Sequence, residues 1–92
     1  MILHFRHRGL QRLFEKGDRR RIHPEHLDKV ENILVILNRA TRPEDLDLPG
    51  LRLHPLRGDL RGFWAVIVRA NWRIVFRFEG GHATDVDFLD YH

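Results

Sequence analysis

The apolar pattern of the sequence changes its period at Gly50, and this change limits the folds that the chain can adopt. Before Gly50, apolar residues recur at helical spacing, whereas after it short turns separate stretches rich in β-branched and aromatic residues. These stretches are LRLHPLRG, GFWAVIVR, NWRIVFRF and HATDVDFLDYH. Helices followed by a run of strands predict an α+β fold with an antiparallel sheet.

The part before Gly50 predicts one short strand and two main helices. MILHF has the composition of a strand, and Gly17 suits the left-handed residue that ends the first helix. Pro24 suits the first turn of the second helix. Thr41 and Glu44 predict a capping box for a brief helical turn. The apolar residues at helical spacing are Leu10, Leu13 and Phe14 in the first helix, and Leu27, Val30, Leu34 and Leu37 in the second.

A tight turn at Ala70 and Asn71 is expected to join two of the strands. With a two-residue loop, side chains alternate between the two faces of the hairpin. One face then holds the core, namely Phe63, Ala65, Ile67, Ile74, Phe76 and Phe78. The other holds Trp64, Val66, Val68, Arg73, Val75 and Arg77. His54, Arg73 and Trp64 are therefore expected to share the open face, although a bulge would reverse the assignment.

The length and composition indicate one domain over residues 1–92, with a modest core. The chain has no cysteine, so disulfides and thiolate metal sites are excluded, which fits a reducing cytoplasm. Charges and histidines interrupt the first apolar stretch, so we expect no signal peptide, and no apolar run is long enough to cross a membrane.

The basic residues favour a polyanionic partner. All but two of the 16 are arginines, whose planar fork matches phosphate and stacks on bases. Nucleic acid is the first such partner to consider, and a GC-rich genome is the alternative explanation for the arginines. The histidine pairs in HFRH and HPEH are weak metal signals, so no metal or other cofactor is expected. The absence of serine and of a phosphate-binding glycine loop excludes serine catalysis and P-loop hydrolysis.

The remaining candidates suit metal-free chemistry on RNA. His54 precedes Pro55 and should stand at a strand end, either as a surface histidine or as a general base or acid. Arg73 lies within an apolar strand, where its charge needs water or an anion such as phosphate. RNA supplies its own nucleophile, the 2′-hydroxyl. The candidate RNA contacts are Arg57, Arg69 and Asn71, with Trp64 and Tyr91 as possible base-stacking residues.

HFRHRGLQRLFEKG, LHPLRGDLRGFWAV, VRANWRIVF and the final DYH together resemble the HigB toxins, a branch of the RelE/ParE superfamily. The resemblance covers essentially the whole chain. It implies two main helices packed on one face of a twisted antiparallel sheet, as in the microbial ribonucleases. It also implies a cytoplasmic, ribosome-dependent endoribonuclease that cuts mRNA in the decoding site of the 30S subunit. The implied antitoxin is a HigA-type helix-turn-helix protein, and the toxin alone is expected to be a monomer.

The resemblance also implies roles for individual residues. His54 matches a proton-transfer histidine, Arg73 a phosphate-binding arginine, and Asn71 a polar neighbour of the site. Arg57 stands where relatives often have lysine, and an arginine cannot readily donate a proton. The final Asp90, Tyr91 and His92 match a C-terminal catalytic cluster.

Strict alternation in the last strand conflicts with this cluster. With Val86 and Phe88 in the core, Asp90 and His92 would face the core too, away from His54. The resemblance therefore predicts a bend or bulge near Leu89.

Two other functions remain open at this stage. One is a gyrase-inhibiting toxin of the same fold without a nuclease site. The other is a non-catalytic, basic regulatory module that binds nucleic acid. His54 and the final Asp90–Tyr91–His92 speak against the gyrase-inhibiting toxin. The absence of a helix-turn-helix pattern speaks against the regulatory module.

Overall fold

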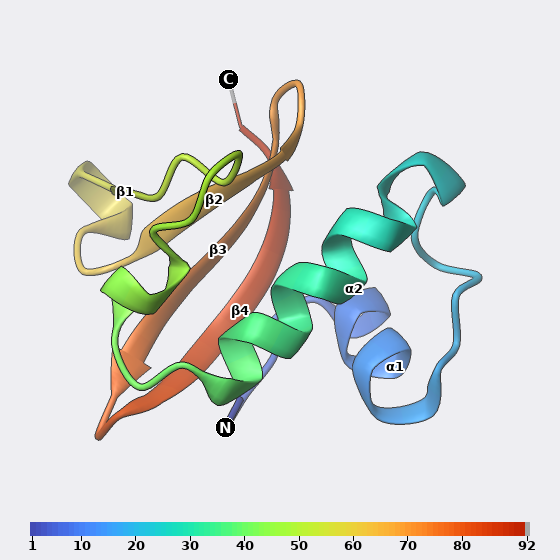
Figure 1. Ribbon diagram of the computed structural model, residues 1–92, viewed down its shortest axis with the longest axis horizontal. Helices are drawn as coiled ribbons and strands as arrows, with labels where there is room; N and C mark the ends of the chain where they lie inside the picture. Colours follow the sequence, from blue (N-terminus) through green and yellow to red (C-terminus); the bar gives the residue numbers. More distant parts are fainter. Residues whose placement is uncertain (92) are drawn as a thin grey trace.

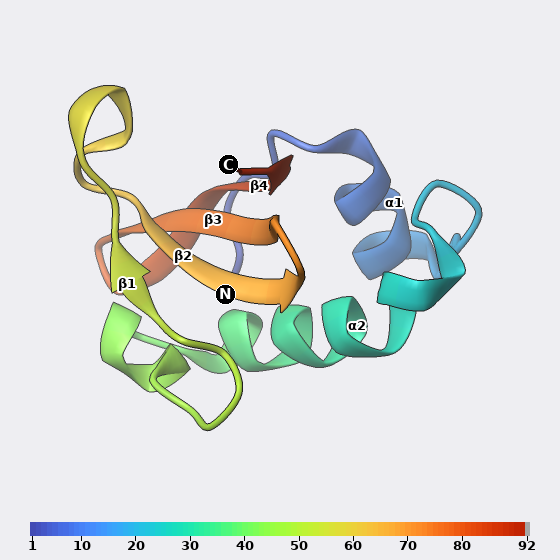
Figure 2. The same ribbon diagram turned by 90° about the horizontal axis from the view of Figure 1, so that it is seen from above.

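The computed structural model describes residues 1–91 and confirms the expected α+β fold (Figure 1). Two main helices lie on one side of an antiparallel sheet with strand order β1-β2-β3-β4 (Figures 1 and 2). Residues 2–6 run beside β4 in the parallel direction, through bridges at Ile2–Ala83 and Phe5–Val86. The elements are α1 (Arg8–Lys16), α2 (Pro24–Arg39), the 3-10 turn η1 (Pro43–Leu46), β1 (His54–Pro55), the 3-10 turn η2 (Gly58–Leu60), β2 (Trp64–Arg69), β3 (Trp72–Glu79) and β4 (His82–Asp90).

The helices begin and end where the sequence indicates. Gly17 follows α1 with a φ of 67°, a conformation that glycine adopts without strain, and Pro24 is the first residue of α2. The predicted capping box of Thr41 and Glu44 is wrong. The residue that precedes η1 is Arg42, which makes no side-chain cap bond, and Thr41 instead donates through its backbone N–H and its hydroxyl to Asp45, at 2.9 and 3.4 Å.

A bulge in β2 overturns half of the predicted assignment of faces. The turn has two residues as expected, because Arg69 pairs with Trp72, but the next pair is Ile67 with Arg73, so Val68 has no partner in the ladder. From that point the side chains of β2 point to the opposite faces from those predicted. The helix-covered core therefore takes Val66, Val68 and Trp64 rather than Phe63, Ala65 and Ile67. The assignment for β3 is confirmed, since Ile74 and Phe76 are fully buried in that core.

A second bulge lies in β4 at Asp85, whose φ of 51° is unusual for a residue other than glycine. Val75 pairs with Asp87 and Arg77 with Thr84, so two residues of β4 face one residue of β3. The main core fills the space between the sheet and the helices, and its largest fully buried side chains are Phe76, Leu10, Ile33, Leu34, Leu37, Leu46 and Ile74. Within residues 1–91, no helix has the length and apolar character needed to cross a membrane.

Candidate active site

His54 stands on the short edge strand β1, on the sheet face that the helices do not cover. It pairs with Ala65, which pairs with Val75, so the three side chains share one row of the sheet. The Nδ1 atom of His54 lies 2.9 Å from the carbonyl oxygen of Arg52. A carbonyl can only accept, so this contact requires the proton on Nδ1. The Nε2 atom of the neutral ring is then left with a lone pair that can take a proton.

Arg73 lies on the same face as His54, as predicted. It pairs with Ile67 and Leu89, one row along the sheet from Val75. From the spacing of strands and of residues along them, the Cα atoms of His54 and Arg73 lie about 12 Å apart. Two long side chains can meet at one phosphate across that distance.

The guanidinium of Arg73 is held on one side and incompletely bonded. Its Nη1 donates to the carbonyl oxygen of Ala70 at 2.7 Å. Its Nε is buried and has no hydrogen-bond partner among residues 1–91. A buried N–H without a partner costs roughly 1–3 kcal/mol. Such a cost persists at sites where a function needs the group.

The floor of this face is a small apolar cluster of Leu56, Phe63, Ala65 and Val75. Ala65 and Val75 of this cluster lie on the sheet between His54 and Arg73, so the surface that separates the two side chains is apolar. The guanidinium of Arg6 lies 4.9 Å from the ring centre of Phe63, so a second cation covers the same face. Arg6 was not among the residues predicted for this face, because it reaches the face only through the pairing of residues 2–6 with β4.

Arg77 is the third arginine on this face, and an acid neutralises it. Its Nε lies 2.6 Å from Oδ2 of Asp85, and the other oxygen of the same carboxylate, Oδ1, lies 2.8 Å from Nδ1 of His4. The hydrogen bond from Arg77, with help from His4, holds the pKa of Asp85 below its usual range. Arg77 is therefore committed to an ion pair, whereas the only partner that the described residues offer Arg73 at short range is a neutral carbonyl.

The last residues of β4 are fixed beside the β2–β3 turn. The backbone N–H of Tyr91 donates to the carbonyl oxygen of Asn71 at 2.8 Å, and the Tyr91 side chain is exposed. The predicted bulge near Leu89 is wrong, because β3 and β4 pair in unbroken register from Val75–Asp87 to Trp72–Asp90. Asp90 consequently shares its face with Trp72, on the opposite side from Arg73. The expected proximity of His92 to His54 concerns a residue outside the described part of the chain.

The other predicted RNA contacts are dispersed. Trp64 pairs with Phe76 and packs on the main core, so its expected place beside His54 and Arg73 is wrong, and the bulge at Val68 is the reason. Arg69 is exposed and forms a 3.1 Å ion pair with Glu25 at the start of α2. Arg57 is exposed just beyond β1, near His54 in the chain.

The open face thus combines an imidazole whose Nδ1 is bonded to the Arg52 carbonyl with a guanidinium whose Nε has no partner among residues 1–91. An imidazole can accept or donate a proton, and a guanidinium can neutralise a phosphate. Both stand on paired strands over an apolar floor, which holds them rigidly. This arrangement suits acid–base chemistry on a phosphodiester.

Comparison with known proteins agrees with these features. Residues 3–92 match the family model described as RelE-like toxin of type II toxin–antitoxin system HigB. The chain is 41% identical to Endoribonuclease HigB of Proteus vulgaris, with all of both chains covered. It is 31% identical to Toxin HigB-1 of Vibrio cholerae serotype O1, over all of this chain and 98% of the other. The chain therefore belongs to the HigB family of RelE-like toxins of type II toxin–antitoxin systems.

Proposed function

We propose that this toxin is a metal-independent endoribonuclease that cuts mRNA in the decoding site of the translating ribosome. The observation that carries the proposal is that His54 and Arg73 lie on the same open face of the sheet. It is supported by a relative, aligned over the full length of both chains, that is named an endoribonuclease. The excess of arginine supports a polyanionic substrate. Because such an enzyme acts on translating ribosomes, we propose that it works in the cytoplasm.

In the proposed reaction, the 2′-hydroxyl of the RNA attacks the adjacent phosphorus and the P–O5′ bond breaks. A base must accept the proton of the 2′-hydroxyl, and an acid must return a proton to the departing 5′-oxygen. Nε2 of His54 is suited to one of these transfers because the Arg52 carbonyl holds the proton on Nδ1. The guanidinium of Arg73 neutralises the charge that gathers on the phosphoryl oxygens.

The second proton-transfer group belongs, in this proposal, to the final Asp90–Tyr91–His92 segment. The hydrogen bond from the backbone N–H of Tyr91 to the carbonyl oxygen of Asn71 holds the chain beside the β2–β3 turn as far as Tyr91. Asp90 lies on the other face from Arg73, so we assign it to the support of its neighbours in the segment rather than to the phosphate. Arg57, Arg69 and Asn71 are proposed to contact RNA on either side of the scissile linkage.

The proposed neutralising partner is a helix-turn-helix antitoxin of the HigA type, since membership of a type II family implies an antitoxin. The free toxin is proposed to be a monomer that acts with the 30S subunit and mRNA.

Primer extension on an mRNA under translation in a reconstituted system tests the proposal. We expect cuts at codon-defined positions with ribosomes and poor cleavage of the same RNA without them, because the ribosome aligns the substrate. His54→Ala should abolish the cuts, and His92→Gln should remove most growth inhibition in cells. Undiminished cleavage by His54→Ala, or DNA damage in place of mRNA cuts, would overturn the proposal.

A further inference from the structure

Left-handed backbone occurs at three residues other than glycine in the part of the chain that the structure describes. These residues, each with a φ of 51°, are Arg52, Ala70 and Asp85. The conformation crowds the Cβ atom of any residue except glycine, so it persists only where the surrounding structure imposes it, and it clusters at functional sites. Each of the three bonds to one polar side chain of the open face. In the same order, these side chains are His54, Arg73 and Arg77.

The stretch before β1 has one residue more than a regular ladder needs. The Leu51 carbonyl accepts a hydrogen bond from the N–H of Ile67. His54 pairs with Ala65, so three steps along this stretch lie opposite two steps along β2. One extra residue on one strand is the arrangement of a β-bulge, in which a left-handed residue is common and which re-aims side chains beside active sites.

This bulge explains how the ring of His54 reaches the carbonyl of Arg52. In a regular strand the carbonyls lie in the plane of the sheet and the side chains stand out of it. A ring would then not reach the carbonyl two residues earlier in the chain. The turned backbone at Arg52 takes the peptide out of that plane and makes the 2.9 Å contact with Nδ1 of His54 possible.

The β2–β3 turn is of the type in which only the first central residue is left-handed. Ala70 has a positive φ and Asn71 does not, which corresponds to a type II′ turn, where glycine is the usual first residue. In a type I′ turn both central residues are left-handed, and the peptide between them is turned over. The carbonyl of Ala70 would then point to the other face. The conformation of this turn therefore directs the carbonyl to Arg73, 2.7 Å from Nη1.

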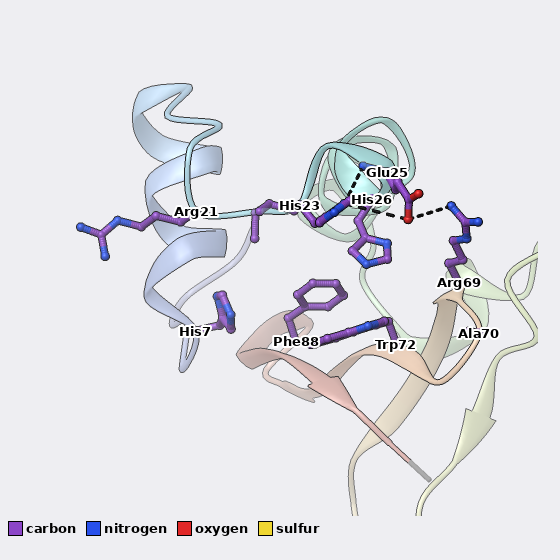
Figure 3. A pocket seen from close by; sticks show the side chains of 10 residues that line it. His7, Arg21, His23, Glu25, His26, Arg69, Ala70, Trp72 and Phe88 are labelled. Carbon is purple, nitrogen blue, oxygen red and sulfur yellow. Dashed lines mark hydrogen bonds and ion pairs between the residues drawn. The ribbon is translucent and has the colours of Figure 1, made fainter.

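The side chains of the two residues do not account for their conformation. Arg52 and Ala70 are both exposed, so neither is held by packing. Beside Ala70, a cavity of about 440 Å³ opens between the start of α2 and the ends of β3 and β4, and His26, Trp72 and Phe88 also line it (Figure 3). A larger side chain therefore has room at Ala70. The feature that both positions share is a carbonyl bonded to a group of the candidate site.

We propose that Arg52 and Ala70 are positioning residues of the endoribonuclease and act through their backbones. The carbonyl of Arg52 keeps the proton of His54 on Nδ1, so that Nε2 is the nitrogen left for proton transfer. The carbonyl of Ala70 holds one edge of the Arg73 guanidinium and leaves the rest of the fork to a phosphate. The effect on cleavage rests on the proposed function, whereas the state of the His54 ring can be measured without it.

Arg52→Val and Arg52→Asn form a matched pair of variants. Both remove the guanidinium, but valine strongly disfavours the left-handed backbone, whereas asparagine adopts it readily. Nitrogen NMR of the labelled protein in mildly alkaline solution reports which ring nitrogen of His54 carries the proton. We expect the form with the proton on Nδ1 in the parent and in Arg52→Asn, and a mixture of both forms in Arg52→Val. In cleavage of ribosome-bound mRNA, Arg52→Val should lower kcat about tenfold with KM unchanged, and Arg52→Asn should restore it.

Ala70→Val and Ala70→Gly are a second pair, which decides the question even if Arg52→Val does not fold. Glycine relieves the strain and suits the turn, so Ala70→Gly should raise the urea midpoint and cleave like the parent. Ala70→Val should lower cleavage about tenfold, the loss that goes with one hydrogen bond. In the Arg73→Ala background the same change should cause no further loss, because the group that it positions is gone. A purely structural effect would lower cleavage in both backgrounds.

Four results overturn the positioning role. They are a parent His54 with its proton on Nε2, equal losses in Arg52→Val and Arg52→Asn, parent-like cleavage by the folded valine variants, and a further loss from Ala70→Val in the Arg73→Ala background. Equal losses in the Arg52 pair would assign the effect to the guanidinium. A parent protein that leaves ribosome-bound mRNA intact would instead overturn the proposed function, and the NMR comparison would still decide the role of the Arg52 carbonyl.

Discussion

Arg73→Ala separates the proposed phosphate role of this arginine from any role in stability. Loss of one preorganised donor to a developing oxyanion typically lowers kcat about 10²–10³-fold, or 2.7–4 kcal/mol. Arg73 offers a full charge as well as donors, so we expect at least this loss in cleavage of ribosome-bound mRNA. Arg73→Lys keeps the charge without the planar fork, so its cleavage rate should fall between those of the parent and of Arg73→Ala.

The effect on stability is expected to be small, because two contributions of Arg73 oppose each other. The hydrogen bond from Nη1 to Ala70 stabilises the fold by roughly 1.5–3 kcal/mol, and the unpaired buried Nε costs roughly 1–3 kcal/mol. Replacement by alanine removes both, so the free energy of unfolding should change by no more than about 1 kcal/mol.

Arg77→Ala is the matched control on the same strand and face. It breaks the 2.6 Å ion pair with Asp85, so it should lower the urea midpoint while leaving the cleavage rate per folded molecule near that of the parent. Primer extension measures cleavage, and urea unfolding followed by tryptophan fluorescence measures stability. Parent-like cleavage by Arg73→Ala, or an equal loss in Arg77→Ala, would refute the assignment of the phosphate to Arg73.

Three further changes test other parts of the structure. Nδ1 of His7 accepts from the N–H of Leu10 and caps α1, and burial lowers the pKa of His7, so the free energy of unfolding falls as the pH drops below the unfolded pKa of 6.5. His7→Asn keeps a cap acceptor and should reduce this pH dependence of the unfolding free energy in urea titrations; an unchanged pH dependence would contradict the role of His7. Gly9→Ala should lower the melting temperature despite the better helix propensity of alanine, because the added Cβ would lie 2.8 Å from Cε1 of His7. A higher melting temperature would show that the His7 ring can move aside. Asp85→Asn tolerates the positive φ but loses the charge, so its free energy of unfolding should be lower than the parent's at neutral pH, and this difference should shrink as acid protonates Asp85 in the parent. A difference that stays constant in acid would refute the ion pair with Arg77 as its source.

The order of elements could be predicted because each local signal agrees with the final fold. Gly17 and Pro24 mark helix boundaries by backbone chemistry that does not depend on distant contacts. The bulges at Val68 and Asp85 have no such signal. Valine is a normal strand residue, and its exclusion from the ladder reflects the packing of two valines of β2 against the helices. Such a preference exists only once the core is assembled.

The same limit applies to the candidate site. His54 and Arg73 were expected on one face, and they are. Trp64 was expected beside them but lies on the opposite face, because the bulge at Val68 reverses the faces of β2. The cavity around His26 was missed because HPEH was judged only as a metal motif. Trp72 and Phe88 complete that cavity from other strands, and spacing along the chain carries no information about such a meeting.

The pairing of residues 2–6 with β4 has a consequence for how the molecule opens. Ile2 bridges Ala83 and Phe5 bridges Val86, so this ladder closes a loop of about 80 residues, nearly the whole chain. Contacts between such distant residues slow folding and tie the sheet edge to the global transition. The amide protons of Leu3 and Arg6, which donate to carbonyls of β4, should then exchange with solvent as slowly as those of the central strands. Residues 2–6 would then open only together with the rest of the sheet, so a protease could not release this segment alone.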